Sequence, residues 1–243
     1  MVATHKLPPE LKLPTIVFAS PKGGAGKSTS AVVLGCELAR KGATVIIIDA
    51  DPNHPVTQWG RRDGKPETLE VVSGVTEESI IDLIESSAAR APFVIVDLEG
   101  TASMMVAYAI SRADLVIIPT QGSQLDANEA AKAIRLIRQQ EKAFSRQIPF
   151  AVLFTRTNPA VRPRTLRHIR GQFAAHGVPV LTTQMNEREA YRAIFSFGGT
   201  VRGLDPAQVS NLDSATTNAE ALAVEVIALL RAARDQVTES AVA

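Results

Sequence analysis

Short apolar segments, rich in β-branched residues, alternate with longer amphipathic segments along most of the chain. The apolar segments lack polar residues at every second position, a pattern typical of strands buried on both faces of a parallel sheet. We therefore expect strands at Thr15–Ser20, Val45–Asp49, Leu69–Ser73, Phe93–Asp97, Leu115–Pro119 and Phe150–Thr155.

Helical patterns fill the intervals between these strands. In one of them, Ala130, Ala133, Ile134 and Ile137 recur at spacings of three and four residues and form one apolar face. Repeated strand–helix–strand units predict an α/β fold with a doubly wound, mostly parallel sheet flanked by helices. We expect helices at Ser28–Lys41, Glu77–Arg90, Ser103–Arg112, Asp126–Ala143, Arg164–His176 and Ala219–Val237, and mostly loop at Gly198–Asn218.

Composition excludes several classes of protein. The chain has 243 residues, of which 45% are hydrophobic and 21% charged, as in ordinary globular proteins. Its single cysteine, Cys36, cannot form an intramolecular disulfide framework or a cysteine-rich metal site. No uncharged apolar run approaches the roughly 18–20 residues of a membrane span. We expect a flexible lead-in at residues 1–14, a single domain at 15–243 and a cytoplasmic location.

A glycine-rich segment directly follows the first strand and opens the first long helix. Its glycines allow backbone N–H groups to approach a phosphate, and the helix N-terminus adds partial positive charge. Lys27 can then reach the β- and γ-phosphates, and the Ser28 hydroxyl can bind Mg²⁺. In this strand–loop–helix context the sequence predicts a phosphate site rather than a plain turn.

The same segment departs from the common phosphate loop, because Pro21 stands at the usual first glycine and a second lysine, Lys22, follows it. Lys22-Gly23-Gly24-Ala25-Gly26-Lys27-Ser28 resembles the deviant Walker A motif of the ParA/MinD family of ATPases. The resemblance implies a P-loop NTPase fold, ATP and Mg²⁺ as cofactors, and phosphate contacts from Lys22 through Thr29. It also implies that Lys22 reaches the ATP of the partner subunit in a sandwich dimer.

Two further segments fit the same family. Asp49-Ala50-Asp51-Pro52-Asn53 resembles its switch I, in which the residue matching Asp51 positions the attacking water; a turn or cap residue is the alternative. Val94–Gly100 resembles its Walker B and switch II. The resemblance implies that Asp97 lies beside Mg²⁺, together with Ser28 and Asp51, and that Gly100 lets the next loop respond to the γ-phosphate.

The remaining motifs look most like small plasmid-partition ATPases of the ParF type, and the resemblance covers roughly Thr15 to Leu230. In such relatives the adenine lies near the end of the strand that matches Leu153–Arg156 and near the loop that follows. By resemblance we assign base contacts to Thr155, Arg156 and Asn186. A surface or DNA-facing charge is the alternative interpretation of Arg156.

Charge distribution suggests a second functional surface. The net charge is only +1, yet no Asp or Glu occurs from Lys142 to Asn186, where seven Lys and Arg side chains lie. A cationic surface without base-reading groups suits the phosphate backbone of duplex DNA, although a solvated face is the alternative. We assign non-specific DNA contacts to Arg162, Arg164, Arg167 and Arg170.

By resemblance, the chain is a ParA-type ATPase that partitions plasmid or chromosomal DNA. The resemblance implies a homodimer on ATP, non-specific duplex DNA as a partner, nucleoid association in that state, and no membrane. A centromere-binding adaptor protein would stimulate its slow hydrolysis of ATP. Two alternatives stay open: a relative that positions another cargo or assists T-DNA processing, and a metabolic synthetase such as dethiobiotin synthetase, against which Lys22 argues.

Overall fold

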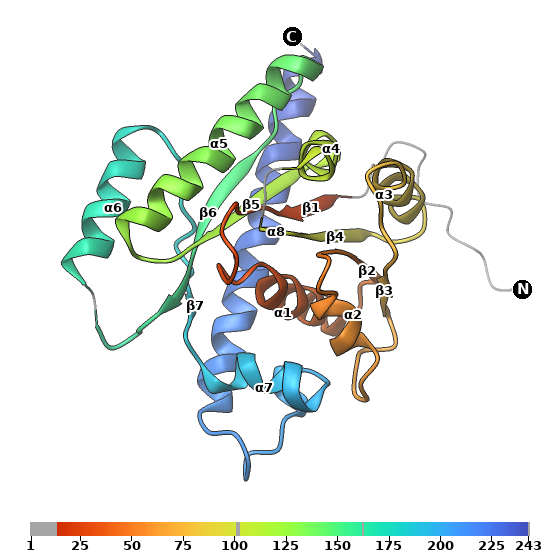
Figure 1. Ribbon diagram of the computed structural model, residues 1–243, viewed down its shortest axis with the longest axis vertical. Coiled ribbons are helices and arrows are strands. Elements are labelled where there is room, and N and C mark those ends of the chain that lie inside the picture. Colours follow the sequence, from red (N-terminus) through yellow and green to blue (C-terminus); the bar gives the residue numbers. More distant parts are fainter. Residues whose placement is uncertain (1–13, 101–102, 162, 243) are drawn as a thin grey trace, which may run out of the picture.

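One sheet of parallel strands forms the centre of the protein. The computed structural model describes residues 14–100, 103–161 and 163–242, and within them seven strands pair in the order β3-β2-β4-β1-β5-β6-β7 (Figure 1). Helices cover both faces, so the predicted doubly wound α/β fold is confirmed. The strands are β1 (Thr15–Phe18), β2 (Val45–Ala50), β3 (Leu69–Val72), β4 (Phe93–Leu98), β5 (Leu115–Thr120), β6 (Phe150–Thr157) and β7 (Met185–Asn186).

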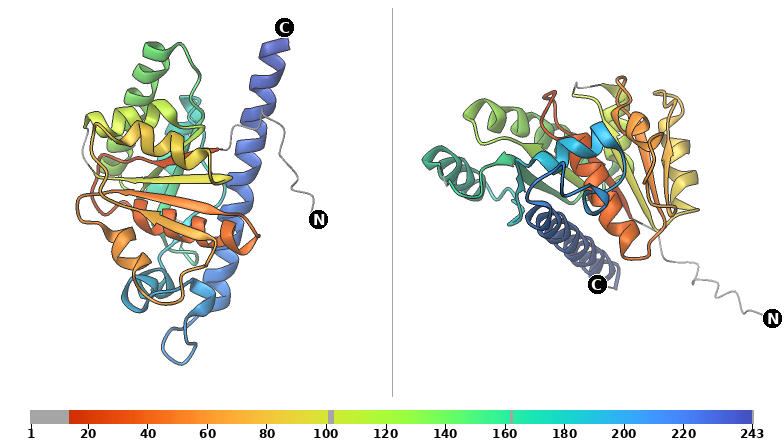
Figure 2. Two further views of the ribbon diagram at one scale, coloured as in Figure 1. Left: turned by 90° about the vertical axis from the view of Figure 1, so that its right-hand side faces the viewer. Right: turned by 90° about the horizontal axis from the view of Figure 1, so that it is seen from below.

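The helices divide into two layers because side chains of each strand alternate between the faces. Ile16 and Phe18 belong to the core cluster that includes residues of α1, α2, α7 and α8, whereas Val17 belongs to the cluster with α3, α4, α5 and α6. Figure 2 shows helices on both sides of the sheet. Trp59 of α2 is 1% exposed and donates its indole N–H to the Gly199 carbonyl at 2.9 Å, so it anchors the first layer. The helices are α1 (Lys27–Arg40), α2 (Pro55–Gly60), α3 (Ile80–Ala88), α4 (Met104–Arg112), α5 (Gln124–Phe144), α6 (Arg164–Ala175), α7 (Glu189–Phe197) and α8 (Leu212–Val242), with a 3₁₀ turn at Val201–Gly203.

The C-terminal third differs most from the sequence-based expectation. The loop expected at Gly198–Asn218 is wrong in its last third, because α8 begins at Leu212. Polar residues and two threonines, which are weak helix formers, hide this start in the sequence. A tertiary contact stabilises it, since the Tyr191 hydroxyl donates to the Ala215 carbonyl at 2.8 Å. The sequence pattern also does not predict α2, α7 and β7.

The strand order determines where a ligand can bind. In an open parallel sheet, ligands bind outside the carboxyl ends of the strands, near the point where the direction of winding reverses. Here β1 lies between β4 and β5, and α1 begins just beyond the carboxyl end of β1. None of the described helices combines the length and apolar character that a membrane crossing requires.

Candidate nucleotide-binding site

The loop between β1 and α1 has the backbone conformation of an anion cradle. Gly24 and Gly26 adopt left-handed φ angles of 71° and 95°, which residues with a Cβ rarely accept. Gly26 is also the N-cap of α1 and supplies no side-chain acceptor. The N–H groups of the first helical turn therefore point out of the helix without intrahelical acceptors, as an anion site requires.

Two side chains from other strands hold this loop in place. The Thr155 hydroxyl lies 2.7 Å from the Ala25 carbonyl oxygen and 3.2 Å from that of Thr120, and donates to one of them at a time. The Gln121 side-chain amide donates to the Gly24 carbonyl at 3.1 Å. Because the loop carbonyls are bound on this side, the loop N–H groups are free to face a ligand.

A cavity of about 460 Å³ opens in front of the loop. The phosphate loop, the Asp49–Asn53 segment and the end of the Val94–Gly100 segment meet in this cavity, because each lies at the carboxyl end of a central strand. The lining also includes Asn53 and Glu99, to which the sequence pattern assigns no role in the site. The lining residues are Gly23, Gly24, Gly26, Lys27, Ser28, Thr29, Asp51, Pro52, Asn53, Glu99, Gly100 and Arg156.

Lys27 and Asp97 form the buried electrostatic centre of the site. Lys27 is 5% exposed; burial lowers the pKa of its ammonium, and the carboxylates of Asp97, Asp51 and Glu99 partly offset this. Asp97 is fully buried, and burial raises its pKa to about 7, against the lowering effects of the Ser28 hydroxyl and the Lys27 charge. The Ser28 hydroxyl is near, but neither carboxylate oxygen of Asp97 has a partner in hydrogen-bond geometry among the described residues. A buried carboxylate without partners is suited to a cation that binds with the ligand.

The two aspartates after β2 have different surroundings. Asp49 is buried and accepts hydrogen bonds from the backbone N–H and the hydroxyl of Thr57, at 2.6 and 2.7 Å, so it fixes the start of α2. Asp51 is half-buried on the cavity wall and accepts from the backbone and side-chain N–H groups of Asn53, at 2.9 and 3.0 Å. Asp51 therefore forms a local turn and also faces the cavity.

Lys22 does not line the cavity. Its ammonium donates to the Asp126 carboxylate of the same chain at 2.5 Å, with Lys22 43% exposed and Asp126 4% exposed. The Ser123 hydroxyl, at the N-cap of α5, donates to the other Asp126 oxygen at 2.5 Å. Burial alone would raise the pKa of Asp126, but the hydrogen bonds from Lys22 and Ser123 outweigh it and hold that pKa below its ordinary value.

Gly100 lies directly against the phosphate loop. A Cβ at this position would lie 2.8 Å from the Gly23 nitrogen and 3.1 Å from the Gly23 Cα, too close for any side chain. The end of the Val94–Gly100 segment therefore touches the loop that precedes Lys27. The two residues after Gly100 lie outside the described residues.

A second cavity, of about 150 Å³, adjoins the first and shares Gly26, Thr29 and Arg156 with it. It contains the predicted base-contact residues Thr155, Arg156 and Asn186. The Asn186 side-chain oxygen accepts from the Thr157 hydroxyl at 2.9 Å, so its NH₂ group is the part left for a ligand. Thr155 is 3% exposed, and its hydroxyl is already bound to the phosphate loop. Thr155 therefore supports the wall of this cavity.

Asn218 of α8 fixes the segment that carries Asn186. Its side-chain oxygen accepts from the Asn186 backbone N–H at 3.1 Å. The same oxygen lies 3.1 Å from the Tyr191 hydroxyl, which donates either to it or to the Ala215 carbonyl. The Asn218 side-chain NH₂ donates to the Gln184 carbonyl at 2.7 Å. One amide group thus contacts three parts of the wall of the second cavity.

Comparisons with known proteins identify the family. A model of the family described as VirC1 protein matches residues 13–233. A protein named ParA from Rhizobium radiobacter is 44% identical over 214 residues, which cover 88% of this chain and 96% of the relative. This chain belongs to the VirC1 family of ParA-type ATPases. The virC1 protein of Rhizobium rhizogenes is 30% identical over 184 residues, 74% of this chain and 79% of the relative. The solved ATP complex of Cyanothece McdA shares the fold, with a TM-score of 0.70 at 17% identity over 88% of this chain and 96% of that chain.

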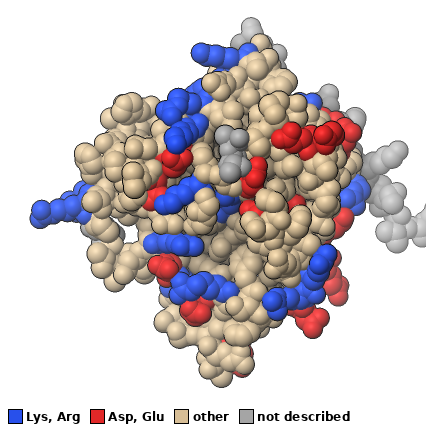
Figure 3. All heavy atoms as spheres, viewed as in Figure 1, with Lys and Arg blue, Asp and Glu red and all other residues tan. Residues whose placement is uncertain are grey.

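The predicted ParA/MinD resemblance is thereby confirmed. The arginines to which the sequence assigns DNA contacts differ in their surroundings in this ParA-type chain. Arg164 and Arg167 of α6 are exposed. Arg170 is half-buried, because it donates to the Leu181 carbonyl at 3.0 Å and lies 5.6 Å from the centre of the Phe154 ring. Arg162 lies outside the described residues. On the face shown in Figure 3, Lys and Arg side chains lie interspersed with Asp and Glu side chains.

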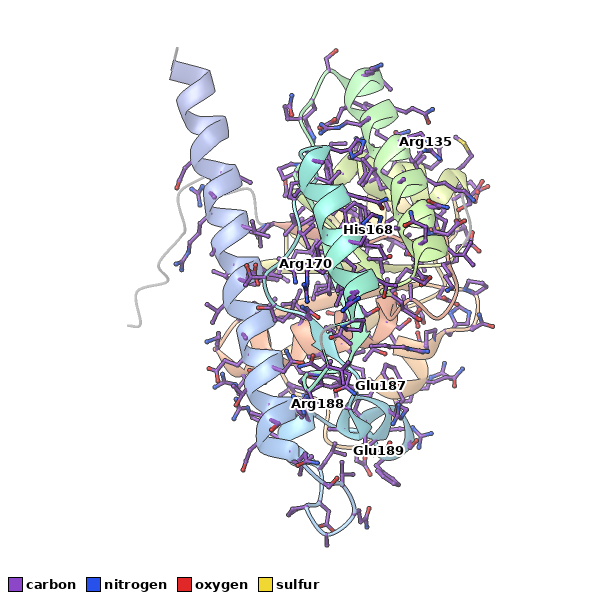
Figure 4. All side chains as sticks on the ribbon, turned by 90° about the vertical axis from the view of Figure 1, so that its left-hand side faces the viewer. Arg135, His168, Arg170, Glu187, Arg188 and Glu189 are labelled. Atoms are coloured by element: carbon purple, nitrogen blue, oxygen red, sulfur yellow. The ribbon has the colours of Figure 1, made fainter. Side chains whose placement is uncertain are left out.

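A groove of about 950 Å³ separates α6 from α8, and Arg167, Arg170 and Arg188 line it. Figure 4 shows Arg170 on α6 and Arg188 at the start of α7, on the side of this ParA-type chain where α6 faces α8. Arg170 therefore belongs to the wall of a groove. Arg164, the first residue of α6, is exposed to solvent. Within the part of the chain that the structure describes, no group of three His, Cys, Asp or Glu side chains is arranged to hold a metal ion.

Proposed function

We propose that this chain is a Mg²⁺-dependent ATPase that binds ATP across the two adjoining cavities. The observation that supports this most strongly is that buried Lys27 and buried Asp97 interact electrostatically beside the phosphate loop, while neither Asp97 oxygen has a hydrogen-bond partner among the described residues. Such a pair is costly in an empty site and is stabilised by a phosphate–metal ligand. Family membership and the 44% identical ParA relative support the same function.

Each residue of the cavity then has a definite role. The N–H groups of the loop from Gly23 to Thr29 bind the phosphates, and Lys27 neutralises their charge. The Ser28 hydroxyl and Asp97 would hold Mg²⁺, which would withdraw charge from the reacting phosphate oxygens. Asp51 orients the attacking water from the cavity wall, and the NH₂ of Asn186, beside Thr155 and Arg156, contacts the base.

Dimer formation on ATP requires Lys22 to change its partner. In the structure its ammonium is bound to Asp126 of its own chain. In the ATP-bound dimer Lys22 leaves Asp126 and contacts the phosphates held by the other subunit. The exposed position of Lys22, at 43%, is compatible with such an exchange.

We propose plasmid or chromosome partition as the biological task. The ATP-bound dimer binds duplex DNA non-specifically through Arg164 and Arg167 and associates with the nucleoid, and a centromere-binding adaptor stimulates hydrolysis. The 44% identical relative named ParA supports this choice. T-DNA processing or the positioning of another cargo is the second candidate, supported by the VirC1 family match. Loss of a resident plasmid when the gene is deleted would support partition over T-DNA processing or the positioning of another cargo.

The ATPase function is tested by two variants and a control. Lys27→Ala should abolish ATP binding, because it removes the buried cation of the phosphate cavity. Asp51→Ala should bind Mg-ATP but release no phosphate, because the positioning of water is lost while Lys27 and the phosphate loop are unchanged. Lys41→Ala, which removes an exposed lysine at the other end of α1, is the matched control. Equilibrium binding and phosphate release are measured; Lys27→Ala binding ATP as tightly as the control would refute the proposal.

A further inference from the structure

Arg156 occupies an irregular position in the sheet. Thr155 pairs with Met185 and Thr157 pairs with Asn186, so Arg156 is an extra residue on β6, in a β-bulge. Its φ angle is 51°, in the left-handed region that residues other than glycine seldom occupy. Backbone strain of this kind is found where a site needs a side chain in one particular place.

The residues on either side explain why Arg156 is forced outwards. Thr155 is buried and bound to the phosphate loop, and Thr157 is buried and donates to Asn186. The Thr157 carbonyl also accepts the Glu187 N–H at 2.9 Å. Because both neighbours are fixed inside the protein, the extra residue between them projects its side chain into solvent, where Arg156 is exposed.

The charges of the side chains that line the phosphate cavity indicate a role for Arg156. Lys27 and Arg156 are the basic residues among the described lining of that cavity, and Asp51 and Glu99 are the acidic ones. Without Arg156, the lining would carry more negative than positive charge while facing a polyphosphate. Lys22 does not compensate, because its ammonium is bound to Asp126. The Arg156 guanidinium has no partner among the described side chains.

We infer that Arg156 is a phosphate-binding residue, the second cation that a single subunit supplies to the nucleotide, and that the strained bulge places it there. This inference rests on the proposed nucleotide function and revises the base contact expected for Arg156. A guanidinium offers two parallel N–H donors that match phosphate oxygens, whereas contact with a neutral base gains little from a full charge. Arg156 thus supplies positive charge in the monomer, before a partner subunit arrives.

Affinities for a series of ligands with increasing numbers of phosphates test the inference. Wild type, Arg156→Ala, Arg156→Lys and Arg192→Ala are titrated with adenosine, AMP, ADP and ATP. Arg192 is the matched control, because it lines the second cavity but pairs with Glu187 and Glu189. We expect Arg156→Ala to bind adenosine as wild type does and to lose roughly 10- to 100-fold in ATP affinity, as for a charged hydrogen bond. Arg156→Lys should recover part of that loss.

Each other result has a defined meaning. An equal loss for adenosine and ATP would assign Arg156 to the base and overturn the inference, as would unchanged ATP affinity. Wild type that binds none of the four ligands would instead refute the proposed ATPase function. Strain is tested separately with Arg156→Gly, which should resist urea better than Arg156→Ala because glycine accepts this φ angle. A glycine variant less stable than the alanine variant would show that the bulge is not strained.

Discussion

The ion pair between Lys22 and Asp126 provides a quantitative test of the proposed dimerisation. Asp126→Asn removes the negative charge but keeps a side-chain oxygen that can accept from Ser123. Lys22 then has no charged partner in its own chain. If Lys22 must leave Asp126 when the ATP-bound dimer forms, the variant no longer has to break that interaction. It should therefore dimerise more tightly than wild type.

The size of the effect follows from the exposure of the two side chains. Asp126 is buried, but Lys22 is 43% exposed and stays hydrated. We therefore place the coupling at about 1 kcal/mol, the upper end of the range for exposed ion pairs. That free energy is roughly a five-fold change in an equilibrium constant. Because both subunits of the dimer lose the pair, the dissociation constant should fall roughly 25-fold.

Sedimentation with a non-hydrolysable ATP analogue measures the dimer, and a double-mutant cycle of Lys22→Ala and Asp126→Asn in urea measures the coupling. Glu129→Gln is the matched control, because it makes the same chemical change in an exposed pair of α5, with Lys132 at 2.6 Å. Dimerisation of Asp126→Asn that equals or falls below that of Glu129→Gln would refute the exchange. Lys22 would then keep Asp126 as its partner in the dimer.

Three further predictions concern other parts of the molecule. Asn218→Ala should lower the free energy of unfolding, measured in urea, by about 1–3 kcal/mol, because it leaves the Asn186 N–H and the Gln184 carbonyl in the wall of the second cavity unpaired. Thr217→Ala, which removes only a hydrogen bond within α8, should lower it less. Arg164→Glu with Arg167→Glu should weaken ATP-dependent binding to random duplex DNA and lower the log–log salt slope by roughly 0.9 for each DNA phosphate that is no longer neutralised, with unchanged ATP affinity; an unchanged slope would exclude both residues. Burial raises the pKa of the Cys36 thiol to about 12, so the contribution of the buried thiol to stability is full below pH 9 and is lost as the pH rises towards 12. Alkylation of Cys36 in the folded protein at pH 8 should therefore be negligible until urea unfolds the chain. Rapid labelling of the native protein would contradict this prediction.

The sequence predicts best those parts of the site whose chemistry is local. Gly24 and Gly26 occur at left-handed positions, so the backbone requirement is visible in the residue type itself. Asp97 ends a continuous apolar run, which places its carboxylate at the carboxyl edge of the sheet. For such residues the element and the spacing already define the position.

The parts that the sequence does not reveal depend on interactions between distant segments. Asp126 holds Lys22 from 104 residues away, and Gln121 holds the phosphate loop from 97 residues away. Neither residue differs in the sequence from an ordinary polar residue near the start of a helix. The bulge at Arg156 is hidden for the same reason, because it exists only once β6 and β7 have paired.

The short strand β7 forms one margin of the sheet, and exposed margins are where β-proteins tend to aggregate. Here the Asn218 amide takes the place of a neighbouring strand, accepting from the Asn186 N–H and donating to the Gln184 carbonyl. The Asn186 N–H and the Gln184 carbonyl are thus already bound within the chain. A strand of another molecule that paired with this margin would first have to displace the Asn218 amide from both groups.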